Sequence, residues 1–258
     1  MAVPPDAGLA RMIASLVRDG VRDDVAVEEP LEIRVRGEAI AVTMRTPGDD
    51  EELALGFLHG EGLLAGPAPA GPTEDLAGNI VEVDATLVRL PPTRRFYATS
   101  SCGVCGKGAL DEVAVLAPPA TAGPRVPREL LAELPMRLTE AQPGFARTGG
   151  LHGAGLFDEH GALIVAREDV GRHNALDKVI GRALLDGLVP LHGRLLCVSG
   201  RLSFELVQKA AVAGAPLLLG VGAPTSLAVA LARDRGMTLC GFARGGTVNV
   251  YTGEQRVA

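Results

Sequence analysis

A length of 258 residues suits one large domain or two smaller ones with a buried core. With a formal net charge of -6, no Trp and 2 Tyr, the chain lacks the basic surface and aromatic rings that a nucleic acid polymer requires. Apolar runs stay below the ~18 residues of a membrane helix, and no charged segment followed by an apolar core opens the chain. We therefore expect a cytoplasmic protein with neither a nucleic acid nor a membrane partner.

The first half of the chain reads as an arm followed by a small α+β domain. Residues 1–24 mix Pro, Asp, Gly and Arg with one short apolar stretch, which favours a flexible N-terminal arm or a loosely docked helix. Alternating residues over 32–46 predict a β-hairpin turning at Arg36-Gly37-Glu38. Acidic residues 49–52 and the later Gly60 and Gly62 predict a helix between them, and further strands are expected at 79–90 and 94–99. This domain, 25–113, ends in a glycine-rich segment with two cysteines.

The second half predicts an α/β domain over 127–258, after a Pro- and Ala-rich linker at 114–126. A helix at 128–141 and a hairpin turning at 159–161 come first, and a helix follows at 173–188. Strands at 194–200, 216–222 and 238–246 then alternate with helices at 203–215 and 225–236, which predicts a largely parallel sheet covered on both faces. In such sheets ligands bind beyond the carboxyl ends of the strands.

Cys102 and Cys105 form a CxxC motif within "TSSCGVCGKGAL" at 99–110, and such a pair can hold a metal, exchange electrons or carry sulfur. A structural zinc needs four ligands. The remaining candidates are His152, His173, Cys197 and Cys240. Because both of those cysteines lie in apolar strands, where a free Cys is a small buried hydrophobe, we expect no structural metal.

A second zinc reading rests on His59-Gly60-Glu61, an H-x-E upstream of the CxxC, as in zinc nucleobase deaminases. Ser101 stands where that pattern has Pro. The alternative is that His59 is a half-exposed residue near a helix C-terminus, where the helix dipole favours it. We prefer this alternative and keep a zinc-dependent deaminase using His59, Glu61, Cys102 and Cys105 as a second hypothesis.

The glycines around the CxxC oppose a regular helix starting at Cys102, which a thioredoxin-type site needs, and favour a mobile tip. A mobile thiol can reach first a donor and then an acceptor. Its activation requires a lowered thiol pKa, for which Lys107, Arg94 or Arg95 could supply positive charge. Sequence alone does not rank Cys102 and Cys105.

The chain resembles the formate dehydrogenase accessory sulfurtransferase family (FdhD). The resemblance rests on five segments in the family's order: 99–110, "TGGLHGAGLFD" at 148–158, "AREDVGRHNALDKVIG" at 166–181, "VSGRLSFELVQKAA" at 198–211 and "LCGFARGGTVNVYTG" at 239–253. It implies a cytidine-deaminase-like three-layer C-terminal domain, a smaller N-terminal α+β domain and a homodimer.

The resemblance also implies a function. Family members accept sulfur from a cysteine desulfurase as a cysteine persulfide and pass it to the molybdenum bis(molybdopterin guanine dinucleotide) cofactor destined for formate dehydrogenase. Carried over, the persulfide falls on Cys102 with Cys105 as second thiol. The cofactor, bound as cargo, falls on Gly241, Phe242, Ala243, Arg244, Gly245 and Gly246. A chaperone that holds the cofactor without moving sulfur is the non-enzymatic alternative.

The residues at 241–246 fit this assignment, because glycines let a phosphate approach backbone N–H groups and an arginine can pair with it. A β-bulge or a tight turn explains the same residues. Other polar residues also have two readings, as ligand contacts or as helix caps and ordinary loop residues. They are Glu168, Asp169, Arg172, His173, Asn174 and Asp177, then Ser199, Gly200, Arg201 and Ser203, and finally His152.

Overall fold

The computed structural model describes residues 5–73, 79–89, 97–98, 119–120 and 123–258. Cys102, Cys105, Lys107, Arg94 and Arg95 lie outside these residues, so the predictions that rest on them stay predictions. The described part is an α/β structure with two main sheets and a separate two-stranded hairpin. Among its helices, none combines the length and the apolar character that a bilayer crossing requires.

The larger sheet has six strands in the order β13-β12-β11-β10-β8-β9. The strands are β8 (His152–Phe157), β9 (Leu163–Asp169), β10 (Leu195–Val198), β11 (Leu217–Gly220), β12 (Thr238–Arg244) and β13 (Thr247–Thr252). Only β10, β11 and β12 pair in parallel, while hairpin partners β8, β9 and β13 run antiparallel to their neighbours. The parallel pairing expected for the three strands that alternate with helices is confirmed, and the whole sheet is mixed because short hairpins at both ends add antiparallel strands.

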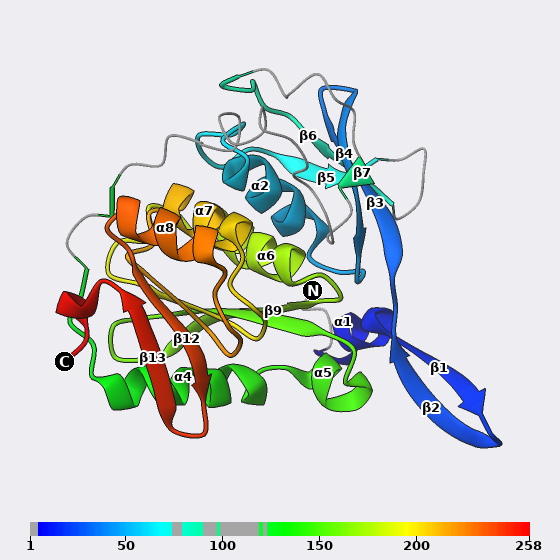
Figure 1. Ribbon diagram of the computed structural model, residues 1–258. Coiled ribbons are helices and arrows are strands. Elements are labelled where there is room, and N and C mark those ends of the chain that lie inside the picture. The colour runs from blue at the N-terminus through cyan, green and yellow to red at the C-terminus, as the bar shows by residue number, and fades with distance from the viewer. Residues whose placement is uncertain (1–4, 74–78, 90–96, 99–118, 121–122) are drawn as a thin grey trace.

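Helices cover both faces of this sheet, as predicted (Figure 1). One face packs on α4 (Arg128–Glu140), and the other on α6 (Arg172–Leu185), α7 (Phe204–Val212) and α8 (Ser226–Asp234). Alternate residues of β10 separate the two cores: Leu195 and Cys197 belong to the cluster beneath α4, and Leu196 and Val198 to the cluster beneath the other helices. A strand buried on both faces reads as a continuous apolar run, which is why "LLCV" carries no polar residue.

The smaller sheet has the order β5-β6-β3-β4-β7. Its strands are β3 (Glu29–Val35), β4 (Glu38–Arg45), β5 (Ala70–Pro72), β6 (Ile80–Val83) and β7 (Tyr97–Ala98), and α2 (Asp50–Gly60) packs against it. The predicted hairpin is confirmed, with Arg36 and Gly37 both at positive φ in its turn. So is the predicted helix at 50–60, whose first turn holds three acidic residues.

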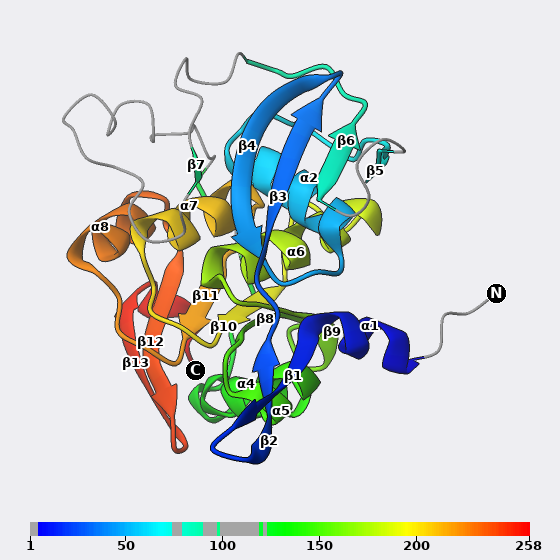
Figure 2. The same cartoon turned by 90° about the vertical axis from the view of Figure 1, so that its right-hand side faces the viewer.

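Helix α2 lies between the smaller sheet and α6 (Figure 2). The two helices touch through glycines: a Cβ placed on Gly56 would lie 1.8 Å from the carbonyl oxygen of Asp177, and one on Gly181 1.8 Å from that of Glu52. A single apolar cluster runs from β3 and α2 into α6 and the larger sheet. The two halves of the chain thus share a core, and the domain boundaries stay a prediction.

The N-terminal segment contains a helix, one of the two alternatives expected from the sequence, and a hairpin that the sequence analysis misses. It forms α1 (Pro5–Met12) and then an antiparallel hairpin of β1 (Ile13–Arg18) and β2 (Val21–Ala26). Asp19 and Gly20 take positive φ in its turn, which is the Asp-Gly signature of a two-residue hairpin loop. The expected helix is therefore present, and the residues after it form a hairpin because a short Asp-Gly turn joins two strands.

Candidate functional site

The carboxyl ends of the central strands gather the polar residues singled out from the sequence. Strand β9 has the same direction as β10, since each runs antiparallel to β8 between them. The first residue of β8, His152, pairs with the last of β9, Asp169. Both therefore lie at the edge where β10 ends before Ser199 and β11 ends at Gly220. We call this the carboxyl edge.

The loops that follow β10 and β11 and the last residues of β12 are joined along the carboxyl edge through their backbones. The N–H of Gly222 donates to the carbonyl of Gly200 over 3.1 Å, and the N–H of Phe242 donates to the carbonyl of Gly222 over 3.1 Å. Gly222 also lies close to Arg201, because a Cβ placed on Gly222 would be 3.0 Å from the Cα of Arg201. Backbone bonding therefore sets Arg201 and Phe242 in one row along the edge.

Residues 241–246 form the end of β12 and the turn into β13. The pairing of the two strands shifts register between Gly241 and Arg244, and Gly245 and Gly246 take positive φ in the turn. Phe242 also has a positive φ of 52°, which is uncommon for an aromatic residue, and its side chain is 36% exposed. The guanidinium carbon of Arg244 lies 6.0 Å from the Phe242 ring centre. The turn expected from the sequence is present, and ligand binding there stays a prediction.

A basic cluster lies beside the first of these loops. Ser199 Oγ accepts the N–H of Gly153 over 3.0 Å and lies 3.3 Å from His152 Nδ1. Arg172 begins α6 and packs against Gly200, where a Cβ would lie 3.2 Å from its Cδ. Burial first, and then the charge of Arg172, lower the pKa of His152, so this imidazole stays neutral at neutral pH.

His173 joins the starts of α6 and α7. Its Nε2 lies 3.0 Å from Ser203 Oγ and 2.9 Å from a Glu205 carboxylate oxygen. This bond with His173 lowers the pKa of Glu205. Ser203 is the N-cap residue of α7, but its side chain forms no cap bond because its hydroxyl is hydrogen-bonded to His173. Sequence analysis named His173 and Ser203 but not Glu205. The only local pattern around Glu205 is an acidic residue in the first turn of a helix, which is common and does not indicate a contact with His173.

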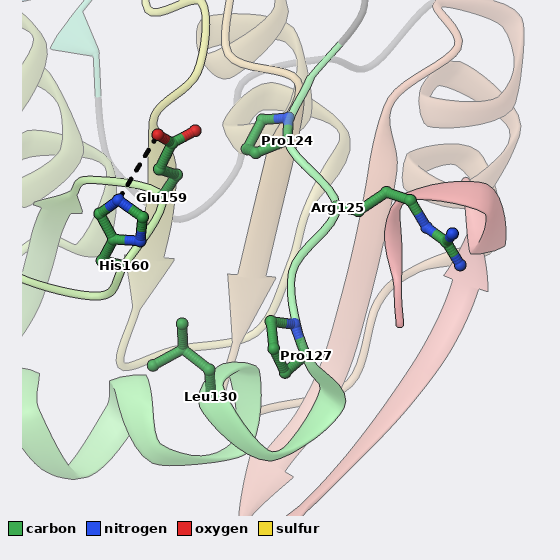
Figure 3. Close-up of a pocket in the computed structure, with 6 residues that line it drawn as sticks. All are labelled: Pro124, Arg125, Pro127, Leu130, Glu159 and His160. Carbon is green, nitrogen blue, oxygen red and sulfur yellow. Dashed lines mark ion pairs between the residues drawn. The ribbon is translucent and has the colours of Figure 1, made fainter.

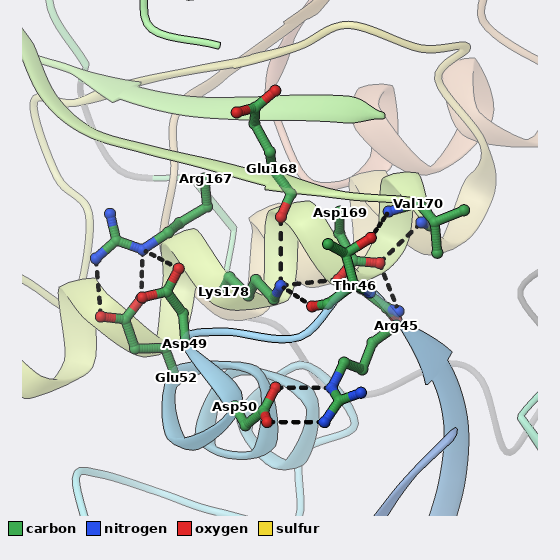
Figure 4. Close-up of polar contacts among 12 residues, drawn as sticks. Arg45, Thr46, Asp49, Asp50, Glu52, Arg167, Glu168, Asp169, Val170 and Lys178 are labelled. Atoms are coloured by element: carbon green, nitrogen blue, oxygen red, sulfur yellow. Dashed lines mark hydrogen bonds and ion pairs between the residues drawn. The ribbon is translucent and has the colours of Figure 1, made fainter. Parts of the chain in front are cut away.

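The polar residues at the start of α6 join the two halves of the structure (Figure 4). Asp169 and Lys178, buried with 0% and 1% of their side chains exposed, form an ion pair of 2.8 Å. Asp169 also accepts the N–H of Thr46 over 3.1 Å, and Asn174 donates to the carbonyl of Met44 over 2.7 Å. These bonds attach the end of β4 to α6, so Asp169 and Asn174 have structural partners. Glu168 accepts the N–H groups of Gly144 and Phe145 at the start of α5 (Pro143–Thr148).

Asp177 is paired with Lys209 of α7, 3.0 Å away. Burial raises the pKa of Asp177 to about 6. Burial would lower the pKa of Lys209, but the carboxylates of Asp177 and Glu61 outweigh it and raise that pKa to about 12. Both groups are therefore charged at neutral pH.

The proposed zinc ligand His59 lies at the end of α2 and is buried, with 6% exposure, so the half-exposed residue expected from the sequence is corrected. Helix α2 packs against α7. Its Nδ1 lies 3.0 Å from the carbonyl oxygen of Leu64, and Glu61 lies 3.4 Å from Lys209. Within the described part of the chain there is no group of three or more His, Cys, Asp or Glu placed to hold a metal ion. The hypothesis of a zinc site stays a prediction, since Cys102 and Cys105 lie outside the described residues.

Cys197 and Cys240 are both fully buried in the sheet, as expected. Burial raises the pKa of each thiol well above its ordinary value. Because the thiolate is the nucleophilic form, neither residue is suited to carry sulfur.

A hollow of about 500 Å³ opens at the opposite edge of the sheet (Figure 3). Its lining includes Pro124, Pro127 and Leu130, with Glu159 and His160 of the β8–β9 turn. That turn follows Phe157, which pairs with Leu195 at the start of β10. The hollow therefore lies away from the carboxyl edge and from every residue predicted to bind a ligand.

These features define an α/β protein whose central sheet carries a basic cluster and a glycine-rich turn along its carboxyl edge. The FdhD/NarQ family model matches residues 26–258. The chain is 53% identical over 262 residues to a protein of Streptomyces coelicolor named sulfur carrier protein FdhD, covering 94% of this chain and 93% of the relative. A protein of the same name from Anaeromyxobacter dehalogenans is 49% identical over 265 residues, covering 94% and 92%.

A crystal structure of a candidate formate dehydrogenase accessory protein from Desulfotalea psychrophila has a similar fold. The TM-score is 0.77 at 27% identity, covering 95% of this chain and 98% of that one. The chain belongs to the FdhD/NarQ family. The predicted family and the α/β fold class are thereby confirmed, and the cytidine-deaminase-like detail stays a prediction.

Proposed function

We propose that this protein is a sulfur carrier required for formate dehydrogenase activity, with Cys102 as the persulfide-bearing residue. The observation that carries the proposal is the CxxC motif in a chain about half identical, over 94% of its length, to proteins named sulfur carriers. A cysteine desulfurase is the sulfur donor, and the molybdenum bis(molybdopterin guanine dinucleotide) cofactor of formate dehydrogenase is the acceptor. The protein acts as a homodimer.

The chemistry needs no resident metal. The Cys102 thiolate attacks the outer sulfur of the donor's persulfide, the donor S–S bond breaks, and the donor cysteine leaves as a thiolate. Cys102 then holds a persulfide. Attack of Cys105 on the Cys102 sulfur forms a disulfide and releases the carried atom at the oxidation level of sulfide. The two electrons come from the cysteine pair, which a cellular dithiol must reduce again before the next cycle.

For the cofactor, bound as cargo, we propose the turn of Gly241, Phe242, Ala243, Arg244, Gly245 and Gly246. Gly245 and Gly246 have positive φ, which leaves their backbone N–H groups accessible in a turn without side chains. The exposed Phe242 ring offers a stacking surface for guanine, and Arg244 offers a bidentate partner for phosphate.

Intact-mass measurement after incubation with a desulfurase and cysteine tests the sulfur-carrying step. We expect one added sulfur atom on the wild type, its loss in Cys102→Ala and its retention in Cys105→Ala. Cys240→Ala is the matched control, because its thiol is buried and its pKa is raised. An adduct lost only in Cys105→Ala would move the persulfide to Cys105. Absence of an adduct in every form would refute sulfur transfer.

A further inference from the structure

Ser199 and His152 form a polar pair that the proposed function does not use. The Ser199 Oγ lies 3.3 Å from His152 Nδ1 and accepts the N–H of Gly153 over 3.0 Å. Because the amide donates to this oxygen, the hydroxyl hydrogen is free to point at the imidazole. Both residues are only partly buried, so the pair is open to solvent.

His152 can accept a proton from this hydroxyl. Burial first, and then the charge of Arg172, lower its pKa, while the charge of Asp169 raises it and that of His173 lowers it by smaller amounts. The ring is therefore neutral at neutral pH, and a neutral imidazole has one nitrogen without hydrogen. A hydroxyl beside such a nitrogen is the arrangement in which a general base activates a serine nucleophile.

Ser203, the other serine beside a histidine, differs in this respect. Its Oγ lies 3.0 Å from His173 Nε2, and the same nitrogen lies 2.9 Å from a carboxylate oxygen of Glu205. The bond with His173 lowers the pKa of Glu205, so its carboxylate is ionised and can only accept. His173 Nε2 must therefore carry a hydrogen, and it cannot take the proton of Ser203.

Positive charge lies beside the Ser199 hydroxyl. A Cβ placed on Gly200, the next residue, would lie 3.2 Å from the Cδ of Arg172 and 3.6 Å from His152 Nδ1, so these two side chains flank the same loop. The carboxylate of Glu205 also acts on Arg172 and offsets part of its charge. The remaining positive charge favours the negative oxygen that develops when a hydroxyl attacks a carbonyl carbon.

We propose that Ser199 and His152 form a nucleophile and general-base pair that cleaves an activated ester. The Ser199 Oγ attacks the carbonyl carbon while its proton passes to His152 Nδ1. The ester C–O bond then breaks, the alcohol leaves with the proton from His152, and the acyl group stays on Ser199. Water releases it as a carboxylic acid by the same route and restores the hydroxyl. This activity goes beyond the proposed function, since neither Cys102 nor the cofactor takes part.

Diisopropyl fluorophosphate tests the nucleophile, because an activated serine attacks its phosphorus and releases fluoride. The full-length protein is labelled, and intact and peptide masses count and locate the adduct. We expect one adduct, on Ser199. In His152→Asn the new amide can still form a hydrogen bond but is not basic, so labelling should be about 10²-fold slower or more. Ser203→Ala is the matched control and should be labelled at the wild-type rate.

The pH dependence of labelling shows which base removes the proton. The wild-type rate should be constant from pH 7 to pH 9 and should fall in acid, because His152 is already neutral at pH 7. A rate that rises tenfold per pH unit over this range would assign the proton to hydroxide and overturn the proposal. So would the absence of an adduct on Ser199. These wild-type measurements decide the matter even if His152→Asn misfolds.

The substrate class has its own test. Labelled protein should lose turnover of p-nitrophenyl acetate, whose ester is activated by a good leaving group. Turnover that survives complete labelling of Ser199 would overturn the assignment to esters. The persulfide experiment above uses neither reagent, so failure of the ester-cleaving pair and failure of sulfur transfer are distinguishable.

Discussion

Asp169 and Lys178 form a fully buried ion pair, with 2.8 Å between the carboxylate oxygen and Nζ. Lys178 also donates to the carbonyl of Thr46 over 2.9 Å and to that of Glu168 over 3.3 Å. Three elements meet at this one ammonium group: the end of β4, the end of β9 and helix α6. The pair therefore fixes the smaller sheet relative to the carboxyl edge.

Lys178→Met tests this role. Removal of one partner leaves Asp169 charged and buried, and such a change costs about 3–5 kcal/mol of unfolding free energy. Urea unfolding measures it. The control is Asp186→Asn, at the end of the same helix, whose ion pair with Arg182 is exposed and should contribute at most about 1 kcal/mol. Equal losses in both variants would contradict a special role for the buried pair.

The second buried pair, Asp177 with Lys209, gives a pH dependence. Asp177 has a pKa of about 6 in the folded protein against 3.8 ordinarily, so the carboxyl takes up a proton on folding between these values. The cost of burying its charge is therefore present above pH ~6 and is relieved as pH falls through that value. In Lys209→Met the folded pKa of Asp177 rises further, because its compensating charge is gone.

The unfolding free energy of Lys209→Met should therefore lie about 3–5 kcal/mol below that of the wild type at pH 8, and the difference should shrink towards pH 6. Denaturant titrations at the two pH values measure it. The double variant Asp177→Asn, Lys209→Met removes both charges and should recover much of the loss without this pH trend. A deficit equal at pH 8 and pH 6 would show that Asp177 is not the group responsible.

The glycine contact between α2 and α6 predicts opposite effects of one substitution at two places. In Gly56→Ala the new Cβ would lie 1.8 Å from the Asp177 carbonyl oxygen, a backbone atom that cannot rotate away. The helices must separate, and we expect a loss of about 1–3 kcal/mol or more. Gly8→Ala in α1 meets no atom within 4 Å and should be neutral or gain up to about 1 kcal/mol. Thermal unfolding of both variants compares them, and a stable Gly56→Ala would refute the close contact.

Phe242→Gly should change the affinity for GDP without changing the stability of the fold. A non-glycine residue at positive φ costs about 1–2 kcal/mol, and this side chain is 36% exposed, so glycine should leave the unfolding free energy nearly unchanged. GDP affinity should fall by about 1–3 kcal/mol if the ring stacks on guanine. Arg36→Gly, at a φ of 50° in the β3–β4 turn, is the control and should not alter affinity. Unchanged GDP binding in Phe242→Gly would remove the ring from the proposed site.

Local patterns predicted much of the fold. The hairpin of β8 and β9 and the alternation from β10 to β12 follow from short apolar runs separated by turn residues. The first hairpin was missed although Asp19-Gly20 signals it, because the charged residues around this turn resemble an arm. The antiparallel ends of the larger sheet depend on which strands become neighbours, and strand spacing does not determine that.

The sequence identified the polar residues of the site, but it did not predict which residues they would pair with. Asp169 and Asn174 read equally well as caps or as ligand contacts, whereas their partners Thr46 and Met44 lie in the other half of the chain. The contact between His173 and Glu205, which begin neighbouring helices, is likewise a property of packing. Long-range pairing of this kind leaves no local pattern in a single sequence.

Helix α2 packs against residues that are synthesised much later than α2 itself. Its glycine face contacts α6, whose residues 172–185 leave the ribosome more than a hundred positions after α2. Until then the apolar side of the smaller sheet and α2 has no permanent cover, and contacts of such high sequence separation form slowly. The first half of this protein is therefore expected to need the second for its native state, and to be at risk of aggregation during synthesis if elongation pauses before α6.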